Sequence, residues 1–103
     1  MKNIEENNPL VSVVIPCYNH EQFVQESIKS VIDQDYKNIE LIVIDDGSKD
    51  HSIEKIQEML PACEERFARF EFRHRANKGL CATLNEAITW CEGKYISFIA
   101  SDD

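Results

Sequence analysis

The sequence lacks the features that mark membrane proteins, secreted proteins and zinc fingers. It has no apolar run near the ~20 residues that a membrane-spanning helix needs, and residues 1–9 are a leader too polar for a secretory signal peptide. Its four cysteines form no C-x-x-C pair, so we expect reduced thiols and a cytoplasmic location. These cysteines are Cys17, Cys63, Cys81 and Cys91.

Basic residues are also scarce. Lys and Arg total 11 against 19 Asp and Glu, which gives a formal net charge of −8. Proteins that bind nucleic acid along its phosphate backbone usually carry a basic stripe, so we expect no nucleic-acid partner. The same balance leaves room for a single nucleotide that is held locally through a metal ion.

What the sequence does have is a regular alternation of short apolar strands and amphipathic helices. At 103 residues it is at most one domain and is small for a complete α/β enzyme. Strands are predicted at 10–15, 39–44, 70–74 and 95–100, and helices at 23–32, 53–63 and 80–91. Right-handed crossovers in this β-α-β-α-β-α-β order make all strands parallel.

Several boundaries can be predicted from single residues. Pro16 is expected to end the first strand because it has no amide N–H to donate. Asn19 is expected to cap the first helix, and Pro61 to kink or interrupt the second. The third helix is expected to bury an apolar face that includes Leu80 and Ile88.

The stretch from Glu40 to Ser52 organises the rest of the chain. Its apolar, β-branched first half is typical of a strand buried on both faces, and it ends abruptly at Asp45 and Asp46. Asp102 and Asp103 follow the last strand, so parallel strands bring four carboxylates to the edge where open α/β sheets bind ligands. Oxygen donors alone favour Mg²⁺ or Mn²⁺, which substrate phosphates often share. Solvated turn residues or helix caps explain such acids equally well.

Two other nucleotide- or phosphate-handling classes fit poorly. A dinucleotide-binding oxidoreductase needs G-x-G-x-x-G after the first strand, and residues 16–21 read PCYNHE. A phosphoacceptor receiver domain resembles a different arrangement, with an acid pair after the first strand and an Asp that ends the third. Here the pair ends the second strand and His74 ends the third.

Four segments, in order, resemble the family 2 glycosyltransferases of the GT-A fold. They read VSVVIPCYN, IELIVIDDGSKD, NKGLCATLNEAI and YISFIASDD, and together they extend from about Leu10 to the last residue. The resemblance implies a Rossmann-like, three-layer α/β half domain over residues 10–103, with strand order 3-2-1-4. It implies that this half binds a nucleotide-sugar donor.

The resemblance also implies roles for individual residues around the base. Asp46 matches the aspartate that accepts a hydrogen bond from the nucleobase, usually uracil. Tyr18 lies where an aromatic ring packs on that base, and Pro16 shapes the loop beneath it. Lys78 lies in a segment that often contributes to the donor site.

The acidic motif after the last strand is the family's metal motif. By resemblance, Asp102 faces the ribose, and Asp102 and Asp103 bind the Mg²⁺ or Mn²⁺ that stabilises the departing nucleoside diphosphate as a Lewis acid. Two positions depart from the pattern, because many relatives have an Asp where Ala100 stands and an Arg where Leu84 stands. Both departures bear on which donor is bound.

As a whole, the resemblance implies an inverting transfer of sugar from a UDP-sugar to an unknown glycan, lipid or protein acceptor. The base of inverting members lies beyond the metal motif, in an acceptor-binding half that we expect to be missing here. We therefore expect no catalytic residue in this segment and no transfer by the 103 residues alone. Membrane association at the inner face, through other segments, stays open. The alternative is a non-catalytic nucleotide-binding or regulatory module that keeps only the donor half.

Overall fold

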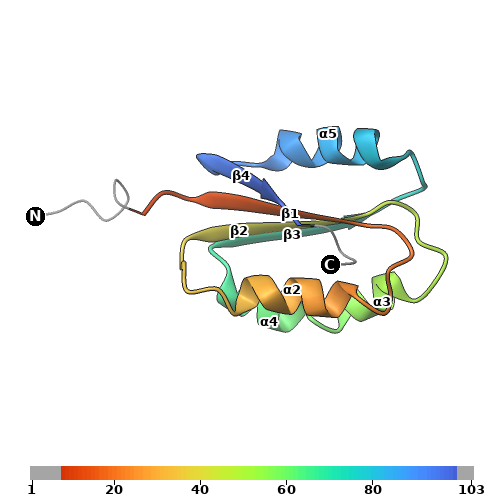
Figure 1. Cartoon of the computed structure of the whole chain (residues 1–103), viewed down its shortest axis with the longest axis horizontal. Helices are drawn as coiled ribbons and strands as arrows, with labels where there is room; N and C mark the ends of the chain where they lie inside the picture. Colours follow the sequence, from red (N-terminus) through yellow and green to blue (C-terminus); the bar gives the residue numbers. More distant parts are fainter. Residues whose placement is uncertain (1–7, 100–103) are drawn as a thin grey trace, which may run out of the picture.

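The fold is a parallel sheet of four strands between two helical layers (Figure 1). In the computed structural model, residues 8–99 are described. The strands are β1 (Val11–Cys17), β2 (Ile39–Asp45), β3 (Arg69–His74) and β4 (Tyr95–Phe98). Their order is β3-β2-β1-β4, and every pair is parallel. This confirms the predicted fold class and strand order.

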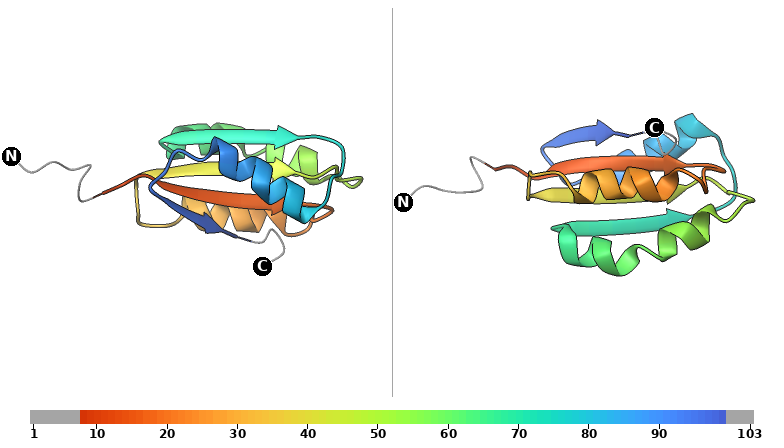
Figure 2. Two further views of the ribbon diagram at one scale, coloured as in Figure 1. Left: turned by 90° about the horizontal axis from the view of Figure 1, so that it is seen from above. Right: turned by 60° about the horizontal axis from the view of Figure 1, so that its bottom comes forward.

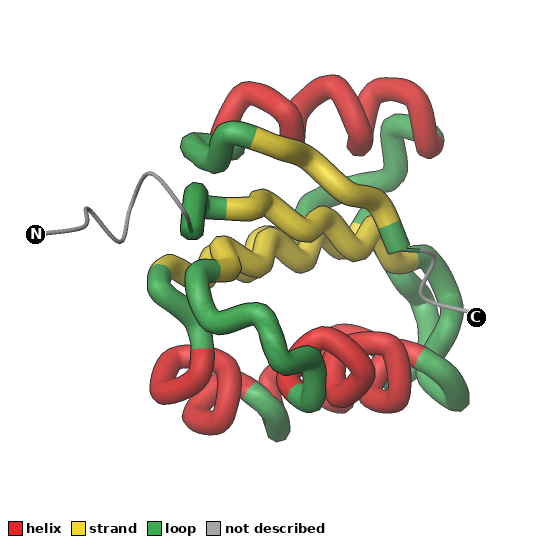
Figure 3. Tube along the Cα trace, turned by 60° about the vertical axis from the view of Figure 1, so that its left-hand side comes forward, coloured by secondary structure: helices red, strands yellow, loops and turns green. Residues whose placement is uncertain are grey.

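The helices lie on both faces of the sheet (Figure 3). They are α2 (Val24–Ile32), α3 (Ser52–Gln57), α4 (Leu60–Arg66) and α5 (Leu80–Trp90). The first three cover one face, and α5 covers the other. Within residues 8–99, no helix combines the length and the apolar character needed to cross a bilayer.

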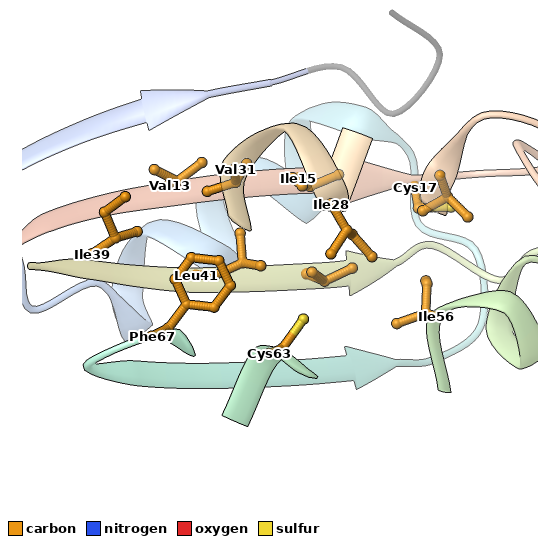
Figure 4. Close-up of a cluster of buried hydrophobic side chains, with 12 residues drawn as sticks. Val13, Ile15, Cys17, Ile28, Val31, Ile39, Leu41, Ile56, Cys63 and Phe67 are labelled. Atoms are coloured by element: carbon orange, nitrogen blue, oxygen red, sulfur yellow. The ribbon is translucent and has the colours of Figure 1, made fainter. Parts of the chain in front are cut away.

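The strand β2 is the centre of the core, as its apolar sequence predicts. All of its residues are buried. Its odd-numbered apolar side chains join the core cluster beneath α2, α3 and α4 (Figure 4). On the other face, Ile42 and Ile44 pack in a smaller cluster with Ala87 of α5. Burial on both faces fixes the position of the acidic residues that follow this strand.

The strand β1 continues through Pro16, although the sequence predicted that it would stop there. The carbonyl of Val14 faces β4, where it accepts from the Ile99 amide at 2.9 Å, and that of Cys17 faces β2, where it accepts from Asp46 at 2.8 Å. Because these groups alternate along a strand, Pro16 faces the β4 side, two residues beyond the last β4 pair at Val14. The proline therefore removes no ladder bond among the described residues.

Asn19 does not cap a helix, contrary to the prediction. The residue before α2 is Phe23, and no side chain caps it. Asn19 instead has a φ of 55°, which asparagine tolerates. Its amide donates to Ser48 Oγ at 2.8 Å, and its Oδ1 accepts from the Lys49 amide at 2.8 Å. Asn19 thus joins the loop after β1 to the loop after β2.

The helix predicted over 53–63 is divided into α3 and α4. Pro61 lies in the first turn of α4, where its missing N–H costs no helical hydrogen bond. The prediction of an interruption at Pro61 is confirmed, and the break falls just before the proline.

The apolar face of α5 is less buried than its sequence predicts. Leu80 is 61% exposed and Ile88 is 42% exposed, whereas Thr83 and Ala87 are fully buried. Of the helices in residues 8–99, α5 alone covers this face of the sheet, so only a narrow strip of its surface is enclosed. All residues of the neighbouring edge strand β4 are also exposed.

An ion pair between the buried Glu40 and the half-buried Arg69 joins strands at the amino-terminal end of the sheet. The Glu40 side chain is fully buried and accepts hydrogen bonds from the Arg69 guanidinium, from Ser12 Oγ at 2.5 Å and from the Glu92 amide at 2.9 Å. A Cβ on Gly93 would lie 2.5 Å from Ser12 Oγ, so this close approach requires glycine. The network ties β1, β2 and β3 to the turn after α5.

The cysteines allow a prediction about thiol reactivity. Cys17 and Cys63 are buried, Cys91 is half-buried and Cys81 is exposed. Burial raises the pKa of the Cys63 thiol to about 11. We expect a thiol reagent at neutral pH to modify Cys81 first and Cys63 last in the folded protein, because thiolate and access are both required.

We also expect four thiols in the denatured, non-reduced protein. Cys81 and Cys91 are separated by a helical rise of roughly 15 Å, beyond the ~7 Å that a disulfide spans between Cα atoms. Mass spectrometry after alkylation gives both the order and the number. Fewer than four alkylated thiols after denaturation would contradict a reduced protein.

Candidate functional site

A cavity of about 320 Å³ lies at the carboxyl ends of β1 and β2 and at the start of α5. Figure 2 shows these strand ends and the first turn of α5 on the same side of the molecule. The volume is within the ~300–1,000 Å³ range of small-molecule sites. The lining residues are Pro16, Cys17, Tyr18, His20, Asp46, Asn77, Gly79, Leu80 and Thr83.

Three of the residues predicted to bind nucleotide line this cavity together. They are Pro16 near the end of β1, Tyr18 in the loop after β1 and Asp46 in the loop after β2. The Tyr18 side chain is accessible, since the residue is 41% exposed. Lys78 is not among the lining residues, and its backbone N–H contacts the site by donating to Asp46. The cavity therefore has one aromatic wall and one acidic group.

Asp46 is held by four donors from the loop between β3 and α5. Its Oδ1 accepts from the Arg75 guanidinium at 2.5 Å and from the Lys78 amide at 2.8 Å. Its Oδ2 accepts from the Asn77 side-chain amide at 3.1 Å and from the Gly79 amide at 3.0 Å. The residue is only 5% exposed. Asp46 thus organises the loop that forms much of the cavity wall.

These hydrogen bonds also fix the charge of Asp46. Burial raises the pKa of its carboxyl group, but hydrogen bonds, chiefly from the Lys78 amide and the Arg75 side chain, outweigh burial and leave the pKa below its ordinary value. The cavity therefore contains an ionised carboxylate at neutral pH.

Arg75 connects this carboxylate to α5. Besides Asp46, its guanidinium donates to Glu86 at 2.7 Å and to Thr83 Oγ1 at 3.0 Å. Burial lowers the pKa of Arg75, but its bonds to Glu86 and Asp46 outweigh burial and leave the pKa above its ordinary value. The guanidinium therefore stays charged. Sequence reasoning missed Arg75, because its partners come from separate segments and no spacing marks them.

The neighbouring Asp45 has a structural role. Its buried carboxylate accepts from the Ser48 amide at 2.8 Å and from Ser48 Oγ at 2.5 Å. Gly47 within this turn has a φ of 77°, and a Cβ there would lie 2.5 Å from the Asn77 nitrogen. Asp45 therefore closes a turn. A role as a turn residue is one of the two explanations that the sequence allowed for these acids.

The predicted metal ligands, Asp102 and Asp103, lie outside the described residues. Within residues 8–99, no three or more His, Cys, Asp or Glu side chains are grouped to hold a metal ion. Asp45 and Asp46 already accept hydrogen bonds on all four carboxylate oxygens.

The chain matches one family model and is similar to several known proteins. The family model described as Glycosyl transferase family 2 matches residues 12–103. The chain is 40% identical over 99 residues to WcaA of Escherichia coli K12, which is named as a colanic acid biosynthesis glycosyl transferase. The matched region covers 95% of this chain and 34% of WcaA. This chain is also 40% identical over 97 residues to an uncharacterized glycosyltransferase of Haemophilus influenzae. That match covers 94% of this chain and 38% of the relative. The chain therefore spans little more than a third of either protein.

Solved structures show the same arrangement. The mannosyltransferase PcManGT from Pyrobaculum calidifontis, in complex with GDP-Man and Mn²⁺, superposes with a TM-score of 0.83 at 21% identity, over 92% of this chain and 28% of the other. TarS of S. aureus in complex with UDP-GlcNAc gives a TM-score of 0.76 at 26% identity, over 89% and 26%. In both pairs, the residues of this chain correspond to about one quarter of a larger protein.

Proposed function

The chain belongs to glycosyl transferase family 2, and from this premise we propose that it forms the donor-binding half of an enzyme that transfers sugar from a UDP-sugar. The observation that carries the proposal is the cavity at the carboxyl edge, which combines an accessible aromatic ring with a buried, ionised carboxylate. Open α/β sheets bind ligands at this edge. A flat base and its hydrogen-bonding edge match these two groups.

We propose that uracil is the base. Its imide N–H would donate to Asp46, its ring would pack on Tyr18, and Pro16 would shape the loop beneath. The complex of TarS with UDP-GlcNAc supports a uridine donor. GDP-Man in PcManGT makes guanosine the principal competitor, although at 21% identity that likeness concerns the fold.

We propose that Asp102 and Asp103 complete the donor site. Asp102 would face the ribose, and both acids would hold Mg²⁺ or Mn²⁺ together with the diphosphate of the donor. When bound, the ion would supply Lewis-acid stabilisation of the departing nucleoside diphosphate. Lys78 lies in the loop between β3 and α5, and its exposed side chain is a further candidate for binding the donor phosphates.

The acceptor and the reaction course are proposals at the level of the family. An inverting transfer needs a general base beside the acceptor hydroxyl, and we place that base outside these 103 residues. The name of WcaA favours a polysaccharide acceptor. We place the protein in the cytoplasm, where lipid and glycan acceptors are reached at the inner face of the membrane.

A non-catalytic module that binds or senses nucleotide is the second candidate function. The cavity at the carboxyl edge would serve such a module equally well, because binding of a nucleotide alone requires no general base beside an acceptor. A coding region that continues into an acceptor domain with an acidic base would exclude this alternative.

The test of the proposal is base selection. We expect UDP to bind more tightly than ADP or GDP, and Asp46→Asn to weaken UDP by about 1–3 kcal/mol, the contribution of a charge-assisted hydrogen bond. Isothermal titration calorimetry measures all three affinities. Asp35→Asn removes the same charge at an exposed position outside the cavity and serves as the control. Equal affinity of the unmodified protein for UDP and ADP would overturn the assignment of Asp46.

A further inference from the structure

The Asp46 carboxylate has a side toward the cavity and a side away from it. The two donors to Oδ2, Asn77 and Gly79, line the cavity. The two donors to Oδ1, Arg75 and Lys78, are not among the lining residues. The donors to Oδ1 thus hold the carboxylate from outside the cavity lining, and the donors to Oδ2 hold it from within that lining.

Of the two donors to Oδ1, only Arg75 comes with supports of its own. Its side chain is 16% exposed, and its guanidinium is fixed by Glu86 at 2.7 Å and by Thr83 at 3.0 Å. Its backbone N–H donates to the carbonyl of Asp45 at 3.3 Å. Thr83 itself is fully buried and lines the cavity. Arg75 thus links the end of β2, which bears the carboxylate, to the first turns of α5.

We propose that Arg75 is a positioning residue for nucleotide recognition, which bonds Oδ1 of Asp46 from outside the cavity lining and so fixes the orientation in which the carboxylate meets the base. This inference rests on the proposed function, since it assigns a purpose to the orientation of Asp46. The planar guanidinium bonds Asp46, Glu86 and Thr83 through three different nitrogens. A lysine amine carries the same charge but is a single, flexible point of attachment.

The experiment compares Arg75→Gln and Arg75→Lys with Arg73→Gln. Arg73 is two residues away and also pairs with an acid, Glu71 at 2.9 Å, but it is 51% exposed and stacks on Trp90 instead of reaching the cavity. We expect Arg75→Gln to weaken UDP about tenfold or more. ADP should change by no more than about twofold, because it lacks the imide N–H that Asp46 reads.

The ratio of UDP to ADP affinity separates positioning from general loss of structure. A merely structural defect lowers both affinities together, whereas loss of positioning lowers the ratio. Arg75→Lys should recover part of the ratio, and Arg73→Gln should keep both affinities within about twofold of the unmodified protein. Arg75→Gln with an unchanged ratio would overturn the inference.

A second readout needs no nucleotide. The amides of Lys78 and Gly79 donate to Asp46, so their hydrogen exchange, measured by NMR, reports whether the carboxylate stays in place. We expect Arg75→Gln to raise exchange at both amides at least about tenfold, and Arg73→Gln to leave it unchanged. Equal exchange in both variants would overturn the positioning role. Lack of UDP preference in the unmodified protein, with the exchange effect present, would refute only the proposed base recognition.

Discussion

Replacing Arg69 by methionine is expected to lower the free energy of unfolding by about 2–3 kcal/mol. The substitution removes the cation from a fully buried Glu40 and leaves its charge, among the described residues, with Ser12 Oγ and the Glu92 amide as donors. This loss is smaller than the ~3–5 kcal/mol of a fully buried ion pair, because the Arg69 side chain is 34% exposed. Urea unfolding followed by circular dichroism measures the difference.

The control for Arg69 is Arg73→Met on the same strand. Arg73 is half-exposed and pairs with Glu71, so its loss should cost about 1 kcal/mol or less. Adding Glu40→Leu to Arg69→Met should restore part of the stability, since the double variant leaves no unpaired buried charge at position 40. A cost for Arg69→Met no larger than that for Arg73→Met would show that Glu40 does not depend on its partner.

Replacing Asp103 by alanine is expected to reduce sugar transfer by the full-length gene product at least about 100-fold. Within residues 8–99, no three or more His, Cys, Asp or Glu side chains are grouped to hold a metal ion, so no second metal cluster in that part of the chain can replace Asp103. Loss of a metal-binding group at a site of this kind removes both metal affinity and Lewis-acid assistance. Transfer from a panel of labelled UDP-sugars measures the effect.

Asp35→Ala is the matched control for Asp103. It removes one carboxylate at an exposed position that does not line the cavity, and we expect it to leave transfer unchanged. Transfer by Asp103→Ala at the rate of the unmodified protein would exclude Asp103 from the metal site.

Much of the fold could be predicted because its signals are local. The apolar run before Asp45 predicts a strand with both faces buried, and all of β2 is buried. The strand predicted over 70–74 is the half-exposed edge strand β3. The strand order came from the resemblance, since the same elements permit other orders.

What could not be predicted depends on contacts between distant segments. The cap assigned to Asn19 was wrong because its side chain bonds Lys49, 30 residues away. The expected burial of Leu80 failed because periodicity predicts an apolar face and does not say whether a neighbour covers it. Arg75 and Glu40 carry no signal in the sequence, since each becomes meaningful only when several elements meet.

Only part of the candidate site could be predicted, because the rest depends on contacts between distant segments. The carboxyl ends of β1 and β2 and the loops that follow them bring Pro16, Tyr18 and Asp46 to one cavity, as parallel strand ends require. The third wall of the cavity, from Asn77 to Thr83, was assigned to the donor site only by resemblance, through Lys78. Its contact with the Asp46 carboxylate includes three hydrogen bonds, from Asn77, Lys78 and Gly79, that no spacing reveals.

The central claim is that the carboxyl-edge cavity binds UDP through Asp46 and a divalent ion. Its most direct test is calorimetric titration of UDP into the protein with Mn²⁺ and with a chelator, repeated for Asp46→Asn and Asp103→Ala. We expect binding with Mn²⁺ that weakens at least about tenfold with chelator or in Asp103→Ala, and that loses preference for UDP over ADP in Asp46→Asn. UDP binding of equal strength under all these conditions would contradict the claim.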